Sequence, residues 1–177
     1  GALNICSPAQ AASRQPDEFY ENASGSPLQR LLQGAQTSID IETYEMDDLA
    51  VDQELRSALS RGVKLNIVQE GTPVGASCHV FDDAVSASSN SAACTRQRAL
   101  VKYVIAHGGK SVPFSKDLCG QPGSRCYEHG KMAIIDGSIA LISTGNFNAT
   151  NLCDRASKPK NCDRDYTLLT YDDPVIS

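Results

Sequence analysis

The chain has 177 residues, of which 41% are hydrophobic and 21% are charged, a composition that suits one globular domain with a sizeable core. The formal net charge of −5 supplies no overall positive field for a polyanion such as DNA, although a local basic groove could still bind one. Apolar runs of about 18 residues are absent from the sequence, which therefore predicts no membrane-spanning helix.

The first part of the chain divides into an arm and the start of a domain. Residues 1–25 are small and polar, with prolines and a glycine that discourage a long helix, so we expect an irregular N-terminal arm. Residues 26–177 are expected to form a single domain. It opens with a short helix, for which Ser26 is the cap, Pro27 the first turn and Gly34 the end.

A strand–helix–strand unit follows. Residues 37–44 and 63–68 have the composition and alternation of strands. The segment between them carries an apolar stripe that Asp47 or Asp48 would cap and Gly62 would end. Two strands joined through a helix are expected to pair in parallel.

The remaining elements complete the predicted fold. Residues 71–93 resemble a loop, and a helix from Thr95 is expected to end at Gly108. Short strands are predicted at 111–114 and 165–171, and two apolar runs between them suggest a hairpin. The sequence thus predicts an α/β fold with a mixed β-sheet flanked by helices on both faces.

Six of the seven cysteines form pairs that are close in sequence and bracket polar loops. The expected disulfides join Cys78 to Cys94, Cys119 to Cys126, and Cys153 to Cys162. They indicate an oxidising compartment, so we expect a secreted or periplasmic protein. A zinc site is the alternative, but these spacings lack a C-x2-C pair and the histidines lie elsewhere, so we expect no metal and no cofactor. Cys6 is left over, which suggests a bond outside the chain.

The hairpin lies within residues 126–151, where an Asp-Gly pair at Asp136 separates the two apolar runs. If the turn has two residues, Lys131 opposes Ile142 and His129 lies two positions outside Lys131 on the same face. The imidazole and the ammonium would then meet at the open end of the hairpin.

Two further polar side chains are expected at that open end. Thr144 would oppose His129 in a two-residue hairpin, and Asn146 follows two positions later. An imidazole, an ammonium, a hydroxyl and an amide together can grip a tetrahedral anion, so the sequence predicts a phosphate-binding site.

These residues follow the pattern HxKxxxxD, then six residues, then a Gly/Ser, Ser/Thr, x, Asn step. The pattern resembles the HKD motif of the phospholipase D superfamily, whose usual Gly-Ser is Ser143-Thr144 here. The earlier helix, the strand SIDIETYEM and the segment RGVKLNIV also resemble the opening of its domains, so the resemblance covers nearly the whole chain after residue 26. One such motif is present.

The resemblance implies a two-step displacement at phosphorus that requires no metal. His129 would attack the phosphodiester and form a phosphohistidine, while a second histidine protonates the leaving alcohol and then activates water or an acceptor alcohol. Lys131, Thr144 and Asn146 would hold the non-bridging oxygens.

The resemblance also assigns supporting residues. A carboxylate shortly after the motif orients the imidazole in this family, which selects Asp165, with Asp163 as the alternative. Asp136 directly precedes Gly137, an Asp-Gly order that tight turns favour. We therefore expect Asp136 to have a structural role, in the turn and in a local ion pair, and not a catalytic one. Glu42 and Tyr44 end a strand that runs beside the site in this family and are candidates for the substrate mouth. Surface placement is the alternative for both.

The expected function is phospholipase D-type hydrolysis or transphosphatidylation of phospholipids. The alternatives are a small secreted or periplasmic HKD endonuclease acting on DNA or RNA, and a non-catalytic binding module on the same fold. His79 and His107 lack the motif partners of a second catalytic histidine. We therefore expect the second half of the site to come from a homodimer or from a companion domain or chain.

Overall fold

The computed structural model describes residues 15–22, 26–73, 78–82, 91–114, 126–153, 161–171 and 176. Most of the predicted N-terminal arm lies outside these ranges. Among the described helices, none combines the length and the apolar character that crossing a membrane requires.

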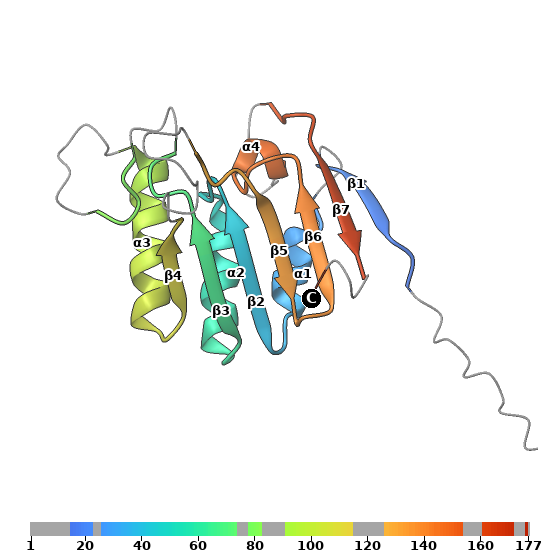
Figure 1. Cartoon of the computed structure of the whole chain (residues 1–177), viewed down its shortest axis with the longest axis horizontal. Helices are drawn as coiled ribbons and strands as arrows, with labels where there is room; N and C mark the ends of the chain where they lie inside the picture. The colour runs from blue at the N-terminus through green and yellow to red at the C-terminus, as the bar shows by residue number, and fades with distance from the viewer. Residues whose placement is uncertain are drawn as a thin grey trace, which may run out of the picture.

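A seven-stranded mixed sheet forms the centre of the structure (Figure 1). Its strands, in spatial order, are β1 (Glu18–Glu21), β7 (Tyr166–Thr170), β6 (Ile139–Ser143), β5 (Lys131–Ile135), β2 (Ser38–Thr43), β3 (Lys64–Gln69) and β4 (Lys110–Pro113). Strands β2, β3 and β4 run parallel, and the other neighbours are antiparallel. The predicted α/β fold with a mixed sheet is confirmed, as is the parallel pairing of β2 with β3.

Strand β1 corrects the expectation of an irregular arm. Residues Glu18–Glu21 pair antiparallel with β7 at the edge of the sheet. Four residues with one exposed aromatic give little local indication of a strand, so β1 depends on a partner strand about 150 residues further along the chain.

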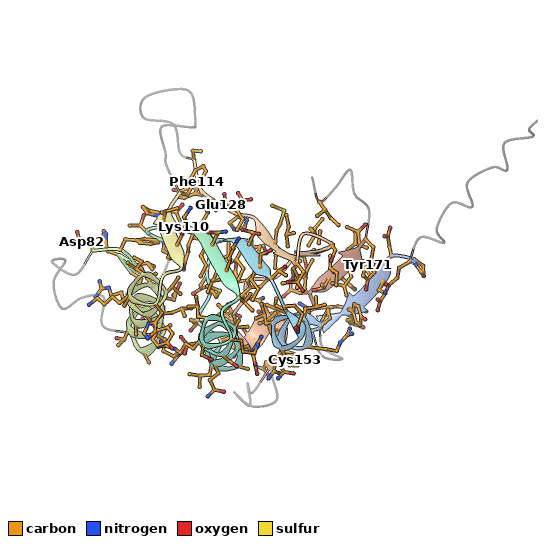
Figure 2. The ribbon with its side chains drawn as sticks, turned by 90° about the horizontal axis from the view of Figure 1, so that it is seen from below. Asp82, Lys110, Phe114, Glu128, Cys153 and Tyr171 are labelled. Carbon is orange, nitrogen blue, oxygen red and sulfur yellow. A yellow bond between two sulfur atoms is a disulfide. The ribbon has the colours of Figure 1, made fainter. Side chains whose placement is uncertain are left out.

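The main helices lie together on one face of the sheet (Figure 2). They are α1 (Leu28–Gly34), α2 (Leu49–Ser60) and α3 (Ala92–Ala106), and a short α4 (Ala149–Leu152) joins the same core through Leu152. On the opposite face Met132 and Ile142 remain 36% and 37% exposed. The predicted helices on a second face are not among the described residues. The face that carries Met132 and Ile142 also carries polar side chains of β2. Polar side chains are more stable in contact with water than under a packed layer of helices.

Side-chain caps and glycines set the ends of the long helices. The carboxylate of Asp48 accepts hydrogen bonds from two backbone N–H groups of α2, so Asp48 rather than Asp47 is the cap. The Ser91 hydroxyl caps α3 by accepting a hydrogen bond from the Cys94 backbone N–H, and the helix begins at Ala92, three residues before the predicted start. Gly62 and Gly108 end the two helices with positive φ angles of 85° and 84°.

The hairpin turn has three residues rather than the expected two. Ile135 pairs with Ile139 and Met132 pairs with Ile142, so the register is shifted by one position. Lys131 therefore does not oppose Ile142. The observed register places Leu141, which is fully buried, on the core face, and the two-residue turn would have exposed it.

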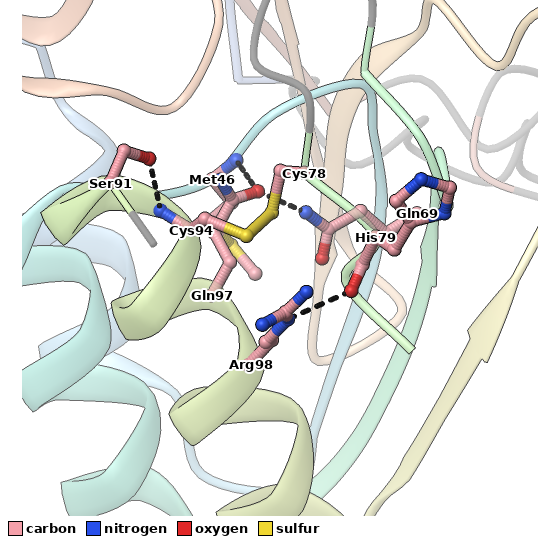
Figure 3. Close-up of a disulfide and its surroundings, with 8 residues drawn as sticks. All are labelled: Met46, Gln69, Cys78, His79, Ser91, Cys94, Gln97 and Arg98. Atoms are coloured by element: carbon pink, nitrogen blue, oxygen red, sulfur yellow. Dashed lines mark hydrogen bonds between the residues drawn. A yellow bond between two sulfur atoms is a disulfide. The ribbon is translucent and has the colours of Figure 1, made fainter. Parts of the chain in front are cut away.

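Two predicted disulfides are confirmed: Cys78–Cys94 and Cys153–Cys162. Cys126 is also disulfide-bonded, whereas its predicted partner Cys119, like Cys6, lies outside the described residues. Figure 3 shows the first disulfide, which joins the loop after β3 to the first turn of α3.

A buried amide network lies beside that disulfide (Figure 3). The Gln97 Oε1 atom accepts hydrogen bonds from Gln69 Nε2 at 2.6 Å and from the Met46 backbone N–H at 3.4 Å. Because Gln69 ends β3 and Met46 follows β2, Gln97 holds α3 against the ends of both strands.

Asp136 connects the hairpin turn to the start of β2. Its carboxylate accepts hydrogen bonds from the backbone N–H groups of Gln36, Thr37 and Ser38, at 2.7 to 3.0 Å. Burial alone would raise the pKa of Asp136, but these backbone bonds outweigh burial and lower it. The described contacts of Asp136 are hydrogen bonds, and none of them is the expected ion pair.

We expect Asp136→Ala to lower the free energy of unfolding by about 1–2 kcal/mol at pH 7, since bonds to a charged but partly exposed acceptor are lost. Urea denaturation measures this change. Because folding lowers the pKa of Asp136, its stabilising effect is present above the ordinary carboxyl pKa of about 3.9 and is lost as the pH falls below it. The difference from wild type should therefore shrink in acid. Ser138→Ala in the same turn is the control, and equal effects of the two changes would contradict the assignment.

Candidate active site

The motif residues gather at the edge of the sheet where β2 and β3 end and β5 begins. Thr43, the last residue of β2, pairs with Lys131, the first residue of β5. Ser143 ends the adjacent strand β6 at the same edge. Asp136 lies at the opposite edge, about 16 Å away along a strand of five residues. The structure therefore separates Asp136 from the other motif residues.

Lys131 and His129 are in direct contact. Lys131 is only 6% exposed, and its Nζ lies 2.8 Å from His129 Nδ1 and donates to the His129 carbonyl oxygen at 2.7 Å. Burial lowers the pKa of Lys131, and the negative charges of Glu128 and Asp165 oppose that shift. An ammonium group can only donate hydrogen bonds, so Nδ1 is the acceptor and the neutral imidazole carries its proton on Nε2.

Tyr44 provides one side of the histidine pocket. Its ring centroid is 4.8 Å from that of His129, with the rings inclined by 56°, and the Lys131 ammonium lies 5.8 Å from the Tyr44 centroid. The Tyr44 backbone N–H also donates to the Gly130 carbonyl oxygen at 3.1 Å. Tyr44, a candidate for the substrate mouth, is 8% exposed and lies against the imidazole.

The structure brings Asp165 to this edge and gives it partners other than the imidazole. Its carboxylate accepts hydrogen bonds from Thr144 Oγ1 at 3.0 Å and from Asn151 Nδ2 at 2.7 Å. Asp163 accepts a second hydrogen bond from Asn151 at 3.0 Å. Thr144 is thus fixed by Asp165, whereas His129 Nδ1 is occupied by Lys131.

Gly145 fits tightly beneath Asp165. A Cβ atom at this position would lie 2.5 Å from the Asp165 Cγ and 2.9 Å from the Asn151 Cβ. Real Cβ atoms essentially never approach other atoms as closely as the first distance. Only glycine therefore allows the Asp165 carboxylate to reach Thr144.

Asn146 is held by an acidic residue that sequence reasoning missed. Its Nδ2 and that of Asn148 each donate to Glu45 Oε2 at 3.4 Å. Burial and the charge of Asp47 raise the pKa of Glu45, and the bond from Asn148 lowers it. The Asn146 Oδ1 atom is buried and has no hydrogen-bond partner among the described residues. The amide therefore retains hydrogen-bonding capacity for a ligand.

Two carboxyl groups lie beside the entry to β5. Glu42 faces the open side of the sheet and lines a cavity of about 280 Å³. Glu128 is 6% exposed and was not identified from the sequence, although it directly precedes His129. The pairing of β2 with β5 brings the two together, and no local pattern encodes that pairing.

The other two histidines are occupied elsewhere. His107 follows α3, where its ring stacks on Tyr103 at 3.8 Å and its Nδ1 lies 2.8 Å from the Tyr103 carbonyl oxygen. The His79 carbonyl accepts a hydrogen bond from Arg98 beside the Cys78–Cys94 disulfide. Over the described part of the chain, no three His, Cys, Asp or Glu side chains are grouped so that they could hold a metal ion.

Comparisons with known proteins agree with the motif. A family model described as "Cardiolipin synthase, PLD-like domain" matches residues 28–177. The fold is similar to NucT from Helicobacter pylori, with 16% identity, a TM-score of 0.62, and coverage of 91% of this chain and 88% of that one. It is also similar to Nuc from Salmonella typhimurium, a phospholipase D family member, with 18% identity, a TM-score of 0.61, and coverage of 91% and 86%.

A third similar structure is polyphosphate kinase from Porphyromonas gingivalis, with 20% identity and a TM-score of 0.56, covering 91% of this chain and 24% of the kinase. At these identities, the structural likeness shows the fold alone. No curated protein matches the chain.

We expect Gly145→Ala to lower the free energy of unfolding by about 1–3 kcal/mol, because the added methyl group displaces Asp165 or Asn151. Thermal and urea denaturation measure the change. Gly34→Ala is the matched control, since a Cβ at Gly34 meets no atom within 4 Å, and its effect should stay within about 0.5 kcal/mol. Similar losses of unfolding free energy in the two variants would show that the space beneath Asp165 can accommodate a methyl group.

Proposed function

Because the chain belongs to the phospholipase D superfamily, we propose that it is a phosphodiesterase in which His129 is the nucleophile. The observation that supports this role is the contact between Lys131 Nζ and His129 Nδ1 at the edge where Thr144 and Asn146 also lie. In this proposal the nucleophile works beside an ammonium, a hydroxyl and an amide.

Substrate binding activates His129 in this proposal. In the free protein the Lys131 ammonium occupies Nδ1, which leaves the proton of the neutral imidazole on Nε2. A phosphodiester anion draws the ammonium away, because a charge-assisted bond to an oxyanion is stronger than one to a neutral nitrogen. The proton then moves to Nδ1, and the Nε2 lone pair attacks phosphorus.

The chemical steps balance as two displacements. In the first, the bond from phosphorus to Nε2 forms while the bond to the leaving alcohol breaks, and a second histidine donates a proton to that alcohol. In the second, the same histidine takes a proton from water or an acceptor alcohol, whose oxygen displaces His129. Lys131, Thr144 and Asn146 stabilise the charge on the non-bridging oxygens. Asp165 acts through Thr144, which it positions.

The second histidine comes from outside this chain. His79 and His107 have the structural contacts described above, and neither has a lysine partner two residues on. We infer that a second copy supplies His129 across a two-fold axis, with a companion domain or chain as the alternative source.

The substrate class we favour is a phospholipid, by hydrolysis or by transfer of the phosphatidyl group. Carboxyl groups surround the site, contributed by Glu42, Glu45, Glu128 and Asp165, and they repel a polyanion such as DNA. The open face of the sheet beside Glu42 carries the exposed apolar side chains of Met132 and Ile142, which suit an acyl chain. Two disulfides favour an oxidising compartment, so we propose that the protein is secreted or periplasmic.

We expect His129→Ala to abolish hydrolysis of both phosphatidylcholine and bis(p-nitrophenyl) phosphate, with a loss of at least about a thousandfold, because no other residue replaces the nucleophile. Activity should persist in EDTA, since an imidazole supplies the attacking atom. Mass spectrometry of quenched protein should detect a phosphorylated or phosphatidylated His129.

His107→Ala is the control for the loss of a histidine and should retain activity. Substantial turnover by His129→Ala would refute the proposal that His129 is the nucleophile. Cleavage of plasmid DNA with no action on the lipid would retain the mechanism and replace the substrate class by the endonuclease alternative.

Mixing the wild type with His129→Ala tests the source of the second histidine. If each site needs His129 from two copies, an equal mixture after subunit exchange contains about one quarter fully active dimers, and activity per total protein falls to that fraction. A chain that works alone gives about one half. Light scattering reports the assembly, and activity of a strictly monomeric protein would refute the shared site.

A further inference from the structure

We propose that Glu42 and Glu128 form a carboxyl pair that shares one proton and positions the segment carrying His129 and Lys131. The proposal rests on the proposed function only for its effect on catalysis. Its structural basis is a set of contacts around Gly130, the residue between the two motif side chains.

Glu128 is fixed by hydrogen bonds of both its backbone and its side chain. Its backbone N–H donates to Glu70 Oε2 at 3.2 Å, and its own Oε1 accepts the Gly130 N–H at 2.5 Å. The carboxylate thus folds back over the turn that leads into β5. Since Glu128 is 6% exposed, water does not provide an equivalent set of bonds.

Glu42 reaches the same place from the neighbouring strand. It pairs with Met132 across the β2–β5 ladder, which sets it on the face opposite to Lys131. A Cβ atom at Gly130 would lie 2.6 Å from Glu128 Oε1 and 3.5 Å from Glu42 Cγ. Both acidic side chains therefore lie close to Gly130, where an added Cβ would displace the Glu128 carboxylate.

The contact between the two carboxyl groups requires a proton. The space over Gly130 brings the Glu42 and Glu128 carboxyl groups together, and a hydrogen bond between them needs one carboxyl group to be protonated as the donor. That hydrogen bond, burial and the charge of Glu128 together raise the pKa of Glu42 to about 7. The raised pKa means that the bonded form exists below about pH 7 and is lost above it, where two carboxylates repel each other.

The protonation state of the Glu42–Glu128 pair affects the motif through Gly130. Its N–H is held by Glu128 and its carbonyl by the Tyr44 N–H, so these bonds fix both peptide groups that join His129 to Lys131. When the pair loses its proton, the two carboxylates repel each other, and this repulsion moves Glu128 away from the Gly130 N–H. The imidazole then loses its fixed position between Lys131 and Tyr44.

Other charged groups lie near the Glu42–Glu128 pair, but each has other partners and none provides the hydrogen bond that the shared proton makes. Glu70, at the end of β3, is engaged with the Glu128 N–H and with Thr72. Lys131 attracts Glu128 from the other face of β5. Asp40, two residues before Glu42 on the same face of β2, is bonded to Asn66 at 2.6 Å.

The structural test follows the Gly130 amide by nuclear magnetic resonance in the His129→Ala background, which removes the neighbouring imidazole. We expect the Gly130 shift to titrate with a midpoint near pH 7. Adding Glu42→Gln should remove this transition, because a glutamine donates to Glu128 at every pH. Asp40→Asn is the matched control, a carboxylate on the same strand and face, and should leave the midpoint unchanged. A Gly130 shift that is flat around neutral pH, or a midpoint near 7 that survives Glu42→Gln, would overturn the pair.

The functional test is the pH profile of kcat/KM in otherwise native protein. At pH 8 only about one tenth of a group with a pKa of 7 keeps its proton, so the wild type should lose most of its rate between pH 6 and pH 8. The Glu42→Gln variant keeps Lys131 and its titration. Only the part of the fall in kcat/KM that is due to the carboxyl pair should therefore disappear from the profile. Identical profiles would refute the positioning role. Absence of hydrolysis at every pH would instead refute the proposed function, while the Gly130 titration would still decide whether the pair exists.

Discussion

The antiparallel pairing of β2 with β5 is the constraint on which the rest of the structure depends. It joins a parallel half, β2 to β4, to an antiparallel half that contains the hairpin. The pairing sets Thr43 opposite Lys131, which aligns the carboxyl end of β2 with the start of β5. Tyr44 then lies against His129, and Glu42 lies beside Glu128. Residues that are about 85 positions apart in the sequence thus form one site because of this ladder.

The spacing of the motif was sufficient to predict that its residues other than Asp136 lie at one end of the hairpin. His129 and Lys131 at one end of a hairpin must approach the residues that follow the second strand, whatever the turn length. The register was not predictable from the turn alone, because an Asp-Gly pair fits loops of two or three residues. Burial of Leu141 decided it, and that burial depends on helices packed from elsewhere in the chain. The parallel strands were predicted for a related reason, since a helix between two strands leaves few other topologies.

The partners of the site residues were harder to predict, because they depend on tertiary contacts. The role of Asp165 was implied by the resemblance to the family, and its hydrogen bonds go to Thr144 and Asn151. Glu45, Glu70 and Glu128 were missed because an isolated glutamate in a sequence is normally a solvated charge. Only the folded chain shows that Glu70 and Glu128 are almost completely buried. Burial changes such a residue from a surface charge into a group that must have partners.

The electrostatic balance of the site follows from those buried groups. Lys131 is drawn toward Glu128 and Asp165, while burial opposes its charge. Under the proposed function, a phosphodiester that binds here brings one more negative charge and competes with the resident carboxylates for the ammonium. A protonated Glu42 reduces that competition by one charge, and Asp165 is already engaged by two donors. The acidic surroundings are therefore compatible with anion binding only while protons and hydrogen bonds neutralise them, which links the chemistry of Lys131 to carboxyl groups outside the motif.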